Sequence, residues 1–477
     1  MEFKSKILAG ESTGVNMNVT DLTVKNDYCI GCGVCAGVCP SNNLYIDWSP
    51  RGELIPHTNN LCNDKCSICL DICPFNNHKI NQDAITNSLF SKTRNIKYNE
   101  YTGYYLNCYV GFRKDTVKRL KSASGGLATS FLASLIKENI VDRIIAVGIS
   151  EDNNRMFNFK ILNNSNEVYS CAGSAYYPVE ISRILKEIIK EKEEFEYAVI
   201  ALPCVAYALR LAIDKIPKLK KKIKIIASLT CGQLQNRFCT ELLSLESGIK
   251  VNELAKMNFR QKSENNSAIN YMQVATDKNG NEGIPQANQE LPSHLWHYQY
   301  FKQNACNFCD DIFGEVADVT FMDAWLPEYI DNYRGTSLII SRTPLALKLL
   351  ENSHEYNLKE ISVNSVIESQ MGLIQKKRTL LKGKLYKSES SNSFYPEKRV
   401  KPDFNVYNEN REFIDLTTEI QDLSKELWPK YRLDKSTAEF WNELKPLESK
   451  IAKYERKIRI KNLMTKPKKF FKKISGS

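Results

Sequence analysis

The sequence predicts an α/β fold (α+β overall) in three parts: a small cysteine-rich domain at residues 20–82, a larger α/β domain at residues 100–385, and a helical extension at residues 411–477. Three observations predict this order. Eight of the fifteen cysteines fall in two blocks near the N-terminus, helical and strand-like apolar patterns then alternate, and the C-terminal part keeps helical spacing alone. With 477 residues and 42% hydrophobic content, the chain can bury more than one core.

The first part is defined by two cysteine blocks, each of which ends in cysteine-proline. The blocks are Cys29, Cys32, Cys35 and Cys39 before Pro40, and Cys62, Cys66, Cys69 and Cys73 before Pro74. A C-x2-C-x2-C loop supplies three thiolates to a cubane cluster, and Gly31 and Gly33 permit its tight backbone. In the bacterial ferredoxin pattern the last cysteine of each run binds the other cluster, so Cys73 would complete the first site and Cys39 the second. We therefore expect a bacterial-ferredoxin-like domain with two 4Fe-4S clusters.

Zinc binding and disulfide bonds are the two alternatives for these cysteines. The second block has the spacing C-x3-C-x2-C-x3-C-P, which we interpret as a tolerated variant, while pairs of C-x2-C also suit tetrahedral zinc. The paired cysteine-proline runs favour clusters, because zinc sites do not need them.

No N-terminal segment resembles a signal peptide and no apolar stretch is long enough to span a bilayer, so we expect a cytoplasmic protein with reduced thiols rather than disulfides.

The middle of the chain alternates between helical and strand-like patterns. Helices are predicted near residues 127–136, Ile181–Ile189 and Val205–Ile213, and strands at Ile144–Ile149, Tyr197–Leu202, Ile223–Leu229 and Val316–Met322. This alternation is typical of strands connected by crossover helices, so we expect a mainly parallel sheet.

Four cysteines of this domain could form a third site. Cys204 and Cys231 each follow a predicted strand, and the carboxyl ends of parallel strands share one edge of a sheet. Cys306 and Cys309 form a C-x2-C pair further along the chain. On spacing alone a third cluster competes with ordinary buried thiols and with a redox or zinc motif. Cys108, Cys171 and Cys239 receive no role.

A loop of small residues, Ser122-Ala123-Ser124-Gly125-Gly126, directly precedes the first predicted helix of this domain. Free backbone N–H groups and the helix dipole at such a terminus favour a phosphate, and Lys118, Arg119 and Lys121 add positive charge. A nucleotide pyrophosphate would fit there. The simpler interpretation is a serine N-cap followed by a flexible turn.

Several motifs in one order resemble the coenzyme F(420) hydrogenase/dehydrogenase beta-subunit family over roughly residues 25–345. They are the two cysteine blocks, Ser122 to Gly126, Gly173-Ser174-Ala175-Tyr176, Leu202-Pro203-Cys204, Cys231-Gly232, Phe259-Arg260-Gln261-Lys262, Cys306-x2-Cys309 and Ala317 to Trp325. Members of this family are iron-sulfur flavoproteins that carry FAD. The flavin exchanges a hydride with an organic substrate or deazaflavin and passes single electrons to clusters.

The resemblance implies roles for individual residues. Ser124, Gly125 and Gly126 would contact the FAD diphosphate, with Ser122 in the same cofactor site, and Cys204, Cys231, Cys306 and Cys309 would hold a third 4Fe-4S cluster near the flavin. The residues expected to line the flavin region are Gly173, Ser174, Tyr176, Arg260, Lys262 and Asp323.

The chain also departs from the family pattern. The family's Gly-Thr-Pro-Cys-Gln appears as Ala201-Leu202-Pro203-Cys204-Val205, and its Gly-Asp-Ala-Trp as Met322-Asp323-Ala324-Trp325, which leaves the substrate open. No acid–base residue is assigned, and we interpret His294 and His297 as structural.

The resemblance implies an FAD-dependent iron-sulfur oxidoreductase that passes electrons between ferredoxin, or another redox protein, and a small organic substrate or deazaflavin. Two alternatives stay open: a non-catalytic electron-transfer subunit of a larger complex, and a redox enzyme that serves polysaccharide biosynthesis.

The net charge of +11 lies almost entirely in the tail, because residues 451–477 hold ten Lys or Arg and a single Glu. The nearly neutral body argues against nucleic-acid binding.

Residues 376–410 read as a linker, followed by helices at Ile414–Leu427 and Phe440–Ile460. We expect the basic, phenylalanine-containing segment 466–474 to be a solvated tail, with weak membrane-surface contact as the alternative.

Overall fold

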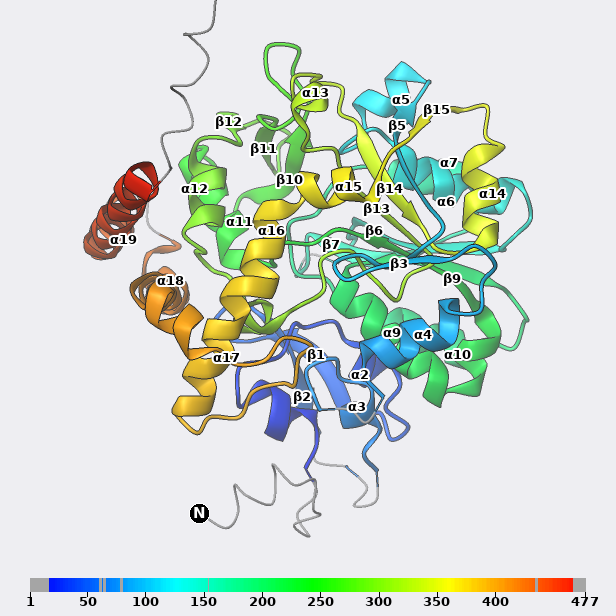
Figure 1. Cartoon of the computed structure of the whole chain (residues 1–477), viewed down its shortest axis with the longest axis horizontal. Coiled ribbons are helices and arrows are strands. Elements are labelled where there is room, and N and C mark those ends of the chain that lie inside the picture. Colours follow the sequence, from blue (N-terminus) through cyan, green and yellow to red (C-terminus); the bar gives the residue numbers. More distant parts are fainter. Residues whose placement is uncertain are drawn as a thin grey trace, which may run out of the picture.

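Figure 1 shows the computed structural model, which describes residues 17–59, 62, 66–77, 80–152, 154–433 and 436–465. The cysteine-rich domain lies at one end of the molecule, the large sheet with its helices forms the body, and the two last helices lie along one side. The predicted α/β architecture is confirmed. The basic segment 466–474 lies outside the described residues.

The cysteine-rich domain is built from short elements around one hairpin. Its strands β1 and β2 pair antiparallel, and alternate residues of β1 are buried. The elements are the π-helical turn η1 (Thr20–Val24), α2 (Val34–Gly37), β1 (Leu44–Trp48), β2 (Leu54–Thr58) and α3 (Ile68–Asp71). The segment that leads into the body carries α4 (Gln82–Phe90), β3 (Lys97–Asn99) and β4 (Gly103–Tyr105).

An eight-stranded sheet with the order β15-β5-β14-β13-β9-β8-β6-β7 forms the body. Its strands are β5 (Asn107–Arg113), β6 (Arg143–Ile149), β7 (Phe157–Leu162), β8 (Tyr197–Ala201), β9 (Ile223–Leu229), β13 (Val319–Asp323), β14 (Ser337–Ser341) and β15 (Tyr356–Glu360). Only the three pairings among β6, β8, β9 and β13 are parallel, whereas β7, β14, β5 and β15 are added antiparallel. The prediction of a mainly parallel sheet is therefore wrong at both edges and right at the centre.

Helices cover both faces of this sheet. The alternation along β8 shows the division, because Ala198 belongs to the core beneath α6 and Val199 to the core shared with α8 and α9. The helices of this part of the chain are α5 (Thr116–Leu120), α6 (Leu127–Lys137), α7 (Ser165–Ser170), α8 (Ser182–Lys190), α9 (Pro203–Lys215), α10 (Pro217–Lys222), α13 (Pro327–Ile330), α14 (Pro344–Glu351), α15 (Val363–Ser369) and α16 (Met371–Ile374). The helices predicted in this domain correspond to α6, α8 and α9.

A second, three-stranded sheet and its helices lie beside the large one (Figure 1). Its strands pair antiparallel in the order β10-β11-β12. The elements of this layer are β10 (Leu254–Gln261), β11 (Met272–Asp277), β12 (Gln286–Ala287), α11 (Arg237–Glu246), α12 (Leu291–His297) and the 3-10 turn η2 (Asn304–Phe308).

The chain ends in helices that pack against the body. They are the π-helical segment η3 (Gln375–Leu380), α17 (Leu381–Ser390), α18 (Phe404–Tyr431) and α19 (Ala438–Thr465). The two predicted C-terminal helices are confirmed and are longer than predicted. The predicted linker at residues 376–410 is wrong in its first part, which is helical and buries Lys377, Leu381 and Leu385.

The cysteine-rich domain shares its core with the body. Its residues Val34 and Ala36 belong to the same buried cluster as Leu185 of α8 and Leu209 of α9. The backbone N–H of Ile181 also donates to the carbonyl of Cys32 at 3.0 Å. The two parts are thus joined by continuous apolar packing.

Candidate functional site

Four of the predicted ligands surround one small cavity in the cysteine-rich domain. Cys29, Cys32, Cys35 and Cys73 line it together with apolar side chains, among them Val34. Cys73 comes from the second block, as the crossed pattern predicts. Burial raises the pKa of Cys29 and Cys35 and raises that of Cys32 to about 12. Without metal these thiols are therefore protonated at neutral pH, and cluster binding would release their protons.

Two glycines shape the loop between the first three cysteines. Gly31 and Gly33 have φ of 67° and 76°, values that favour glycine. A Cβ at Gly31 would lie 2.5 Å from the carbonyl oxygen of Leu54, and the N–H of Gly31 donates to Cys29 Sγ at 3.3 Å. The tight backbone predicted for this loop is confirmed.

The remaining cysteines of the two blocks gather around Cys69. Cys62, Cys66 and Cys39 each interact electrostatically with Cys69, and burial raises the pKa of Cys69 to about 11. Cys39, the last cysteine of the first block, therefore lies with the second set. Both blocks thus exchange their final cysteine, which is the arrangement that the sequence predicts.

The four cysteines proposed for a third site also meet. Cys204 lies in the first turn of α9, Cys231 follows β9, and Cys306 and Cys309 flank the end of η2. Cys204 is half-buried and its thiol interacts electrostatically with the other three. Desolvation of the thiol, and then these neighbouring thiols, raise the pKa of Cys204. The backbone N–H of Leu234 donates to Cys306 Sγ at 3.3 Å. Residues far apart in the sequence are thus brought to the same end of strands β8 and β9.

Sequence reasoning missed three lysines at this third set. Lys377 Nζ donates to Cys309 Sγ at 3.2 Å, while Lys302 and Lys384 both donate to Asn307 Oδ1, at 2.7 and 2.6 Å. Lys302 and Lys377 are buried. For Lys377 and Lys384 the signal in the sequence was a run of basic residues in a segment that reads as a linker, and such runs are usually solvated; Lys302 is an isolated basic residue.

Aromatic side chains connect the first and third sets of cysteines. Tyr28, adjacent to Cys29, packs edge-on against Phe308, which lies between Cys306 and Cys309, with ring centroids 4.9 Å apart. Both rings are buried. On the other side, Cys35 interacts electrostatically with Cys69 of the second set. The three sets therefore form a continuous series.

The small-residue loop lies at the amino end of α6, where Gly126 is the N-cap with φ of 82°. The N–H of Gly125 donates to Ser337 Oγ at 3.0 Å, and Ser124 Oγ donates to the carbonyl of Thr336 at 2.9 Å. Ser122 Oγ turns back to the carbonyl of Lys118 at 2.8 Å. The loop is thus held in a defined shape against β14.

Arg260 lies on β10 and Lys262 directly follows this strand, opposite the loop. Lys262 Nζ donates to the carbonyl of Ser124 at 2.6 Å, and burial, then Arg260 and Arg119, lower its pKa to about 7. Arg260 pairs with Asp323 at 2.8 Å. The structure therefore brings together most of the residues that the resemblance places in the flavin region.

A buried donor in this region has no protein partner. Arg260 Nε is buried without a hydrogen bond, although the guanidinium lies over the ring of Tyr271 at 4.4 Å. Tyr176, also predicted here, packs against Phe259 with ring centroids 5.6 Å apart. An unsatisfied guanidinium N–H beside aromatic rings fits an anionic or polar group of a cofactor such as FAD.

Gly173 and Ser174 are less closely integrated. Gly173 is exposed, has φ of 132° and would have no atom within 4 Å of an added Cβ. Ser174 is half-buried. Their assignment to the flavin region stays a prediction.

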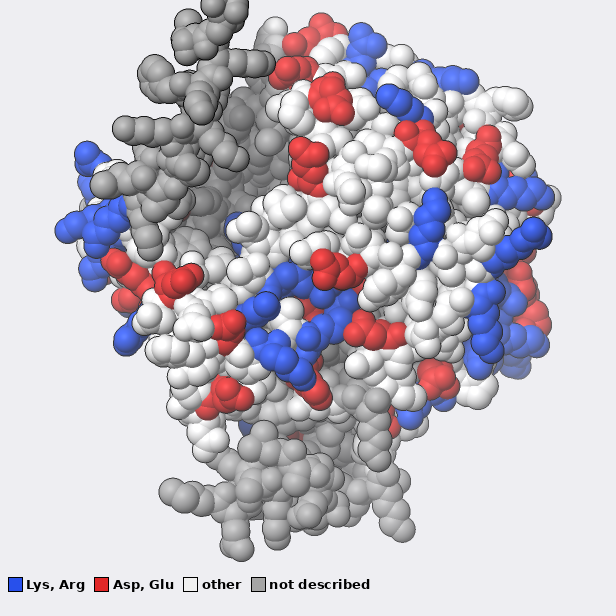
Figure 2. Space-filling model, in the orientation of Figure 1, with Lys and Arg blue, Asp and Glu red and all other residues white. Residues whose placement is uncertain are grey.

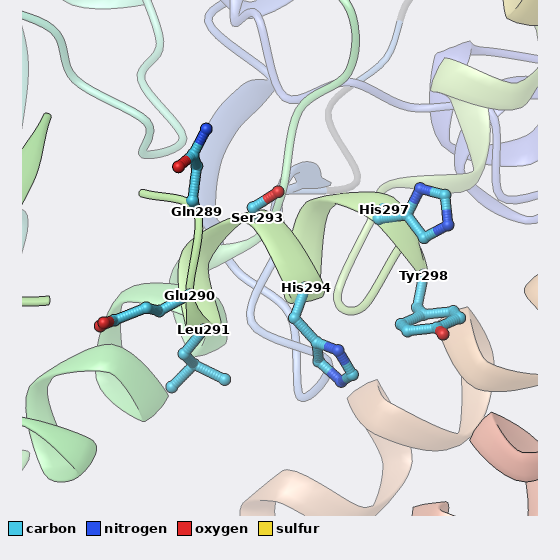
Figure 3. Close-up of a pocket in the computed structure, with 7 residues that line it drawn as sticks. All are labelled: Gln289, Glu290, Leu291, Ser293, His294, His297 and Tyr298. Atoms are coloured by element: carbon cyan, nitrogen blue, oxygen red, sulfur yellow. The ribbon is translucent and has the colours of Figure 1, made fainter. Parts of the chain in front are cut away.

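The histidines interpreted as structural connect α12 to α19. His294 Nε2 lies 2.5 Å from Glu448 Oε1, and His297 Nε2 lies 2.6 Å from Glu455 Oε1. They line an open pocket of about 520 Å³ on the surface of α12 (Figure 3), in which His294 and Tyr298 point toward the C-terminal helices. This pocket contains none of the predicted ligands.

Two further properties of the described residues bear on the site. No group of three or more His, Cys, Asp or Glu side chains is arranged to hold a metal ion in that part of the chain. The thiols of the first set instead surround a cavity, as ligands of a cubane larger than one ion would.

No described helix combines the length and apolarity needed to cross a membrane. Figure 2 shows Lys, Arg, Asp and Glu side chains interspersed over one face.

Three family models match the chain. They are the 4Fe-4S binding domain at residues 22–45, the N-terminal part of the coenzyme F(420) hydrogenase/dehydrogenase beta subunit at residues 108–186, and the C-terminal part of the same subunit at residues 195–364. An uncharacterised protein of Methanocaldococcus jannaschii is 24% identical over 317 residues, which cover 61% of this chain and 79% of that protein. A chain of the F(420)-reducing NiFe hydrogenase complex from Methanosarcina barkeri aligns with a TM-score of 0.48 and 17% identity, covering 63% of this chain and 98% of that one.

Proposed function

Because the chain belongs to the coenzyme F(420) hydrogenase/dehydrogenase beta-subunit family and carries a 4Fe-4S binding domain, we propose that it is an FAD-dependent iron-sulfur oxidoreductase. In this proposal it passes electrons between a ferredoxin-type redox protein and a small organic substrate or deazaflavin. The family and the 4Fe-4S domain make it an iron-sulfur redox protein; FAD, the number of clusters and the partners belong to the proposal.

The observation that carries the proposal is the continuous series of three cysteine sets. It starts at the cysteine-rich end of the molecule, continues through the Tyr28–Phe308 contact and ends at Cys231, beside Gly232. A Cβ at Gly232 would lie 3.2 Å from the ring of Trp296, and Trp296 packs against Tyr176 of the proposed flavin region. Short distances through packed side chains suit electron transfer between these sites.

The residues of the chain would divide the work of holding cofactors. When bound, FAD would supply two-electron hydride chemistry and 4Fe-4S clusters one-electron transfer. The loop at Ser124–Gly126 and the amino end of α6 would hold the diphosphate, with the Lys262 ammonium beside it. The Arg260–Asp323 pair fixes the guanidinium so that its free Nε faces the same region.

The test is the cofactor content of the protein purified without oxygen. We expect about twelve irons, four for each of three clusters, and one FAD per chain. Cys204→Ser should remove about four irons and leave the signals of the other two clusters unchanged. Cys171→Ser is the matched control, because Cys171 is a half-buried thiol outside all three sets. About eight irons without flavin in the unaltered protein would contradict the proposal.

A second measurement separates an enzyme from an electron relay. Addition of a reduced deazaflavin, or of another organic hydride donor, should bleach the flavin absorbance and then reduce the clusters. If only a reduced ferredoxin bleaches the protein and no organic donor does, the chain is a relay subunit.

A further inference from the structure

Three lysine side chains approach the Cys306–Cys309 loop from different elements. Lys302 precedes η2, Lys377 lies in η3 and Lys384 lies in α17. Lys377 Nζ contacts a thiol directly, at 3.2 Å from Cys309 Sγ, and also donates to the carbonyl of Asp311 at 2.8 Å. The other two donate to the side-chain oxygen of Asn307, which lies between the two cysteines. Three lysine side chains thus surround one four-residue loop, and burial lowers the pKa of Lys302 and lowers that of Lys384 to about 7.

These lysines have no carboxylate partner among the described residues. Their hydrogen-bond acceptors are a thiol, backbone carbonyls and the side-chain amides of Asn307 and Gln299. By contrast, Lys425, which is fully buried, pairs with Glu53 at 3.2 Å. The two acidic residues that directly follow the loop have other partners: Asp310 pairs with Arg399 at 3.3 Å, and Asp311 accepts from Gln82 and from the N–H of Gly314.

Buried ammonium groups without an anion are costly, commonly by several kcal/mol each. Neutral thiols do not offset that cost. A cluster held by four thiolates is a net anion, and it gains one further negative charge when it is reduced. The lysines would therefore stabilise the reduced state more than the oxidised state.

The first cysteine set has a different electrostatic environment. Two carboxylates lie near it, since Glu53 interacts with Cys29 and Glu180 with Cys32, and one lysine, Lys398, interacts with Cys73. Each carboxylate is balanced by its own cation, Glu53 by Lys425 and Glu180 by Arg155 at 2.6 Å. This set has no comparable excess of positive charge.

We infer that Lys302, Lys377 and Lys384 form a cationic shell that raises the reduction potential of the third cluster above that of the first. The inference rests on the proposed function, because it requires a cluster at Cys204, Cys231, Cys306 and Cys309. Functionally, electrons would collect at the cluster closest to the flavin region. Lys377 is the main determinant, because it alone donates to a ligand sulfur among the described lysines.

The experiment is a redox titration of the complete, cluster-loaded protein, followed by electron paramagnetic resonance. Lys377→Met should lower the midpoint potential of the third cluster by the equivalent of a tenfold change in its reduction equilibrium, ~59 mV for a one-electron couple. Lys377→Arg keeps the charge and should restore most of that shift. The first two clusters should titrate as in the unaltered protein.

Lys222→Met is the matched control. Lys222 is also a buried lysine, but it donates to the carbonyls of Glu191 and Glu193, away from the cysteines. This variant should leave all three potentials unchanged.

Iron content and potential separate the two ways in which the inference can fail. If the unaltered protein shows only two clusters, both the proposed function and the cationic shell are wrong. If three clusters are present and Lys377→Met titrates like the unaltered protein, the shell alone is wrong. If Lys377→Met loses four irons, its potential cannot be measured, and Lys384→Met is the test instead, because Lys384 contacts Asn307 rather than a ligand. An unchanged potential of the third cluster in Lys384→Met would then overturn the inference.

Discussion

Gly33 shows how closely the cysteine-rich domain fits against the body. Its φ is 76°, and an added Cβ would lie 2.4 Å from Glu180 Oε2 and 3.1 Å from the backbone nitrogen of Ser182. Glu180 cannot move aside freely, because it is paired with Arg155 and accepts from the N–H of Ser182 at 2.5 Å. A side chain at position 33 therefore meets both backbone strain and a fixed neighbour.

We expect Gly33→Ala to lose at least half of the iron of the N-terminal sites and to lower the thermal midpoint. Gly280→Ala is the matched control, because Gly280 has φ of 86° and no atom within 4 Å of an added Cβ. The control should show only the left-handed backbone cost of about 1–2 kcal/mol. Iron assay and thermal unfolding check both variants, and equal effects would contradict the role of the close contact.

Lys262 should make FAD affinity depend on pH. Its pKa is lowered to about 7 by burial, Arg260 and Arg119. Above pH 7 this lysine must therefore take up a proton before its ammonium can pair with a diphosphate. Affinity should therefore be constant below pH 7 and fall by up to about tenfold per pH unit above it. The stability of the flavin-free protein should change with pH in the opposite direction. Between pH 7 and the ordinary lysine pKa of 10.5, Lys262 is protonated in the unfolded state but not in the folded state, so the free energy of unfolding rises with pH.

Flavin fluorescence titrations between pH 6 and 9 measure this affinity. Lys262→Met should bind FAD more weakly and remove the pH dependence, whereas Lys256→Met, at an exposed position of the preceding strand β10, should leave it intact. An unchanged slope in Lys262→Met would exclude this lysine as its source.

Individual residues were predictable when the information was local. The cysteine spacing and the glycines between them fixed the shape of the first loop, because all lie within a few residues of one another. Lys377 could not be identified in this way, since its contact with Cys309 spans 68 residues and its neighbours in sequence are charged. The pairing of Arg260 with Asp323 also depends on tertiary structure.

The helix α18 holds three parts of the molecule together. Lys425 pairs with Glu53 of the cysteine-rich domain, Trp428 Nε1 donates to Glu241 of α11 at 2.8 Å, and the side chain of Asn307 donates to Gln421 Oε1 at 2.9 Å. This helix therefore fixes the cysteine-rich domain relative to the Cys306–Cys309 loop.

Lys425→Met should strongly destabilise this junction. It leaves Glu53 buried without its closest cation, a loss of about 3–5 kcal/mol, and thermal unfolding should begin with release of N-terminal iron. The double variant Lys425→Met, Glu53→Gln should recover part of the loss, because the unpaired charge is removed. Lys430→Met, at an exposed position of the same helix, is the control; equal midpoints for Lys425→Met and this control would contradict the argument.

The regular elements were predictable where apolar periodicity was strong, as in α6, α8, β8 and α18. The direction of the edge strands was not, because a short apolar run is compatible with parallel or antiparallel pairing, and β14 and β15 turn back along the sheet. The segment containing η3 and α17 was misread as a linker, since its Lys- and Ser-rich composition conceals Leu381 and Leu385 in the core.

In the whole molecule, the cysteine-rich domain and the body are distinct in sequence, but they share one hydrophobic core in the structure. Apolar side chains from both sides belong to one core, and Tyr28 and Phe308 meet across it. The three-part organisation was predicted from composition, but this continuity could not be, because it arises from contacts between distant segments.

The exchange of the last cysteine between the two blocks also sets an order for biosynthesis. Because the first cavity needs Cys73, neither N-terminal site is complete until the second block has left the ribosome. The third set closes only after Cys309 and Lys377 have been made, and the bond between Asn307 and Gln421 forms later still. Under this ligand assignment the cysteines of the N-terminal sites leave the ribosome before those of the third set, and α18, which contacts both parts, follows them.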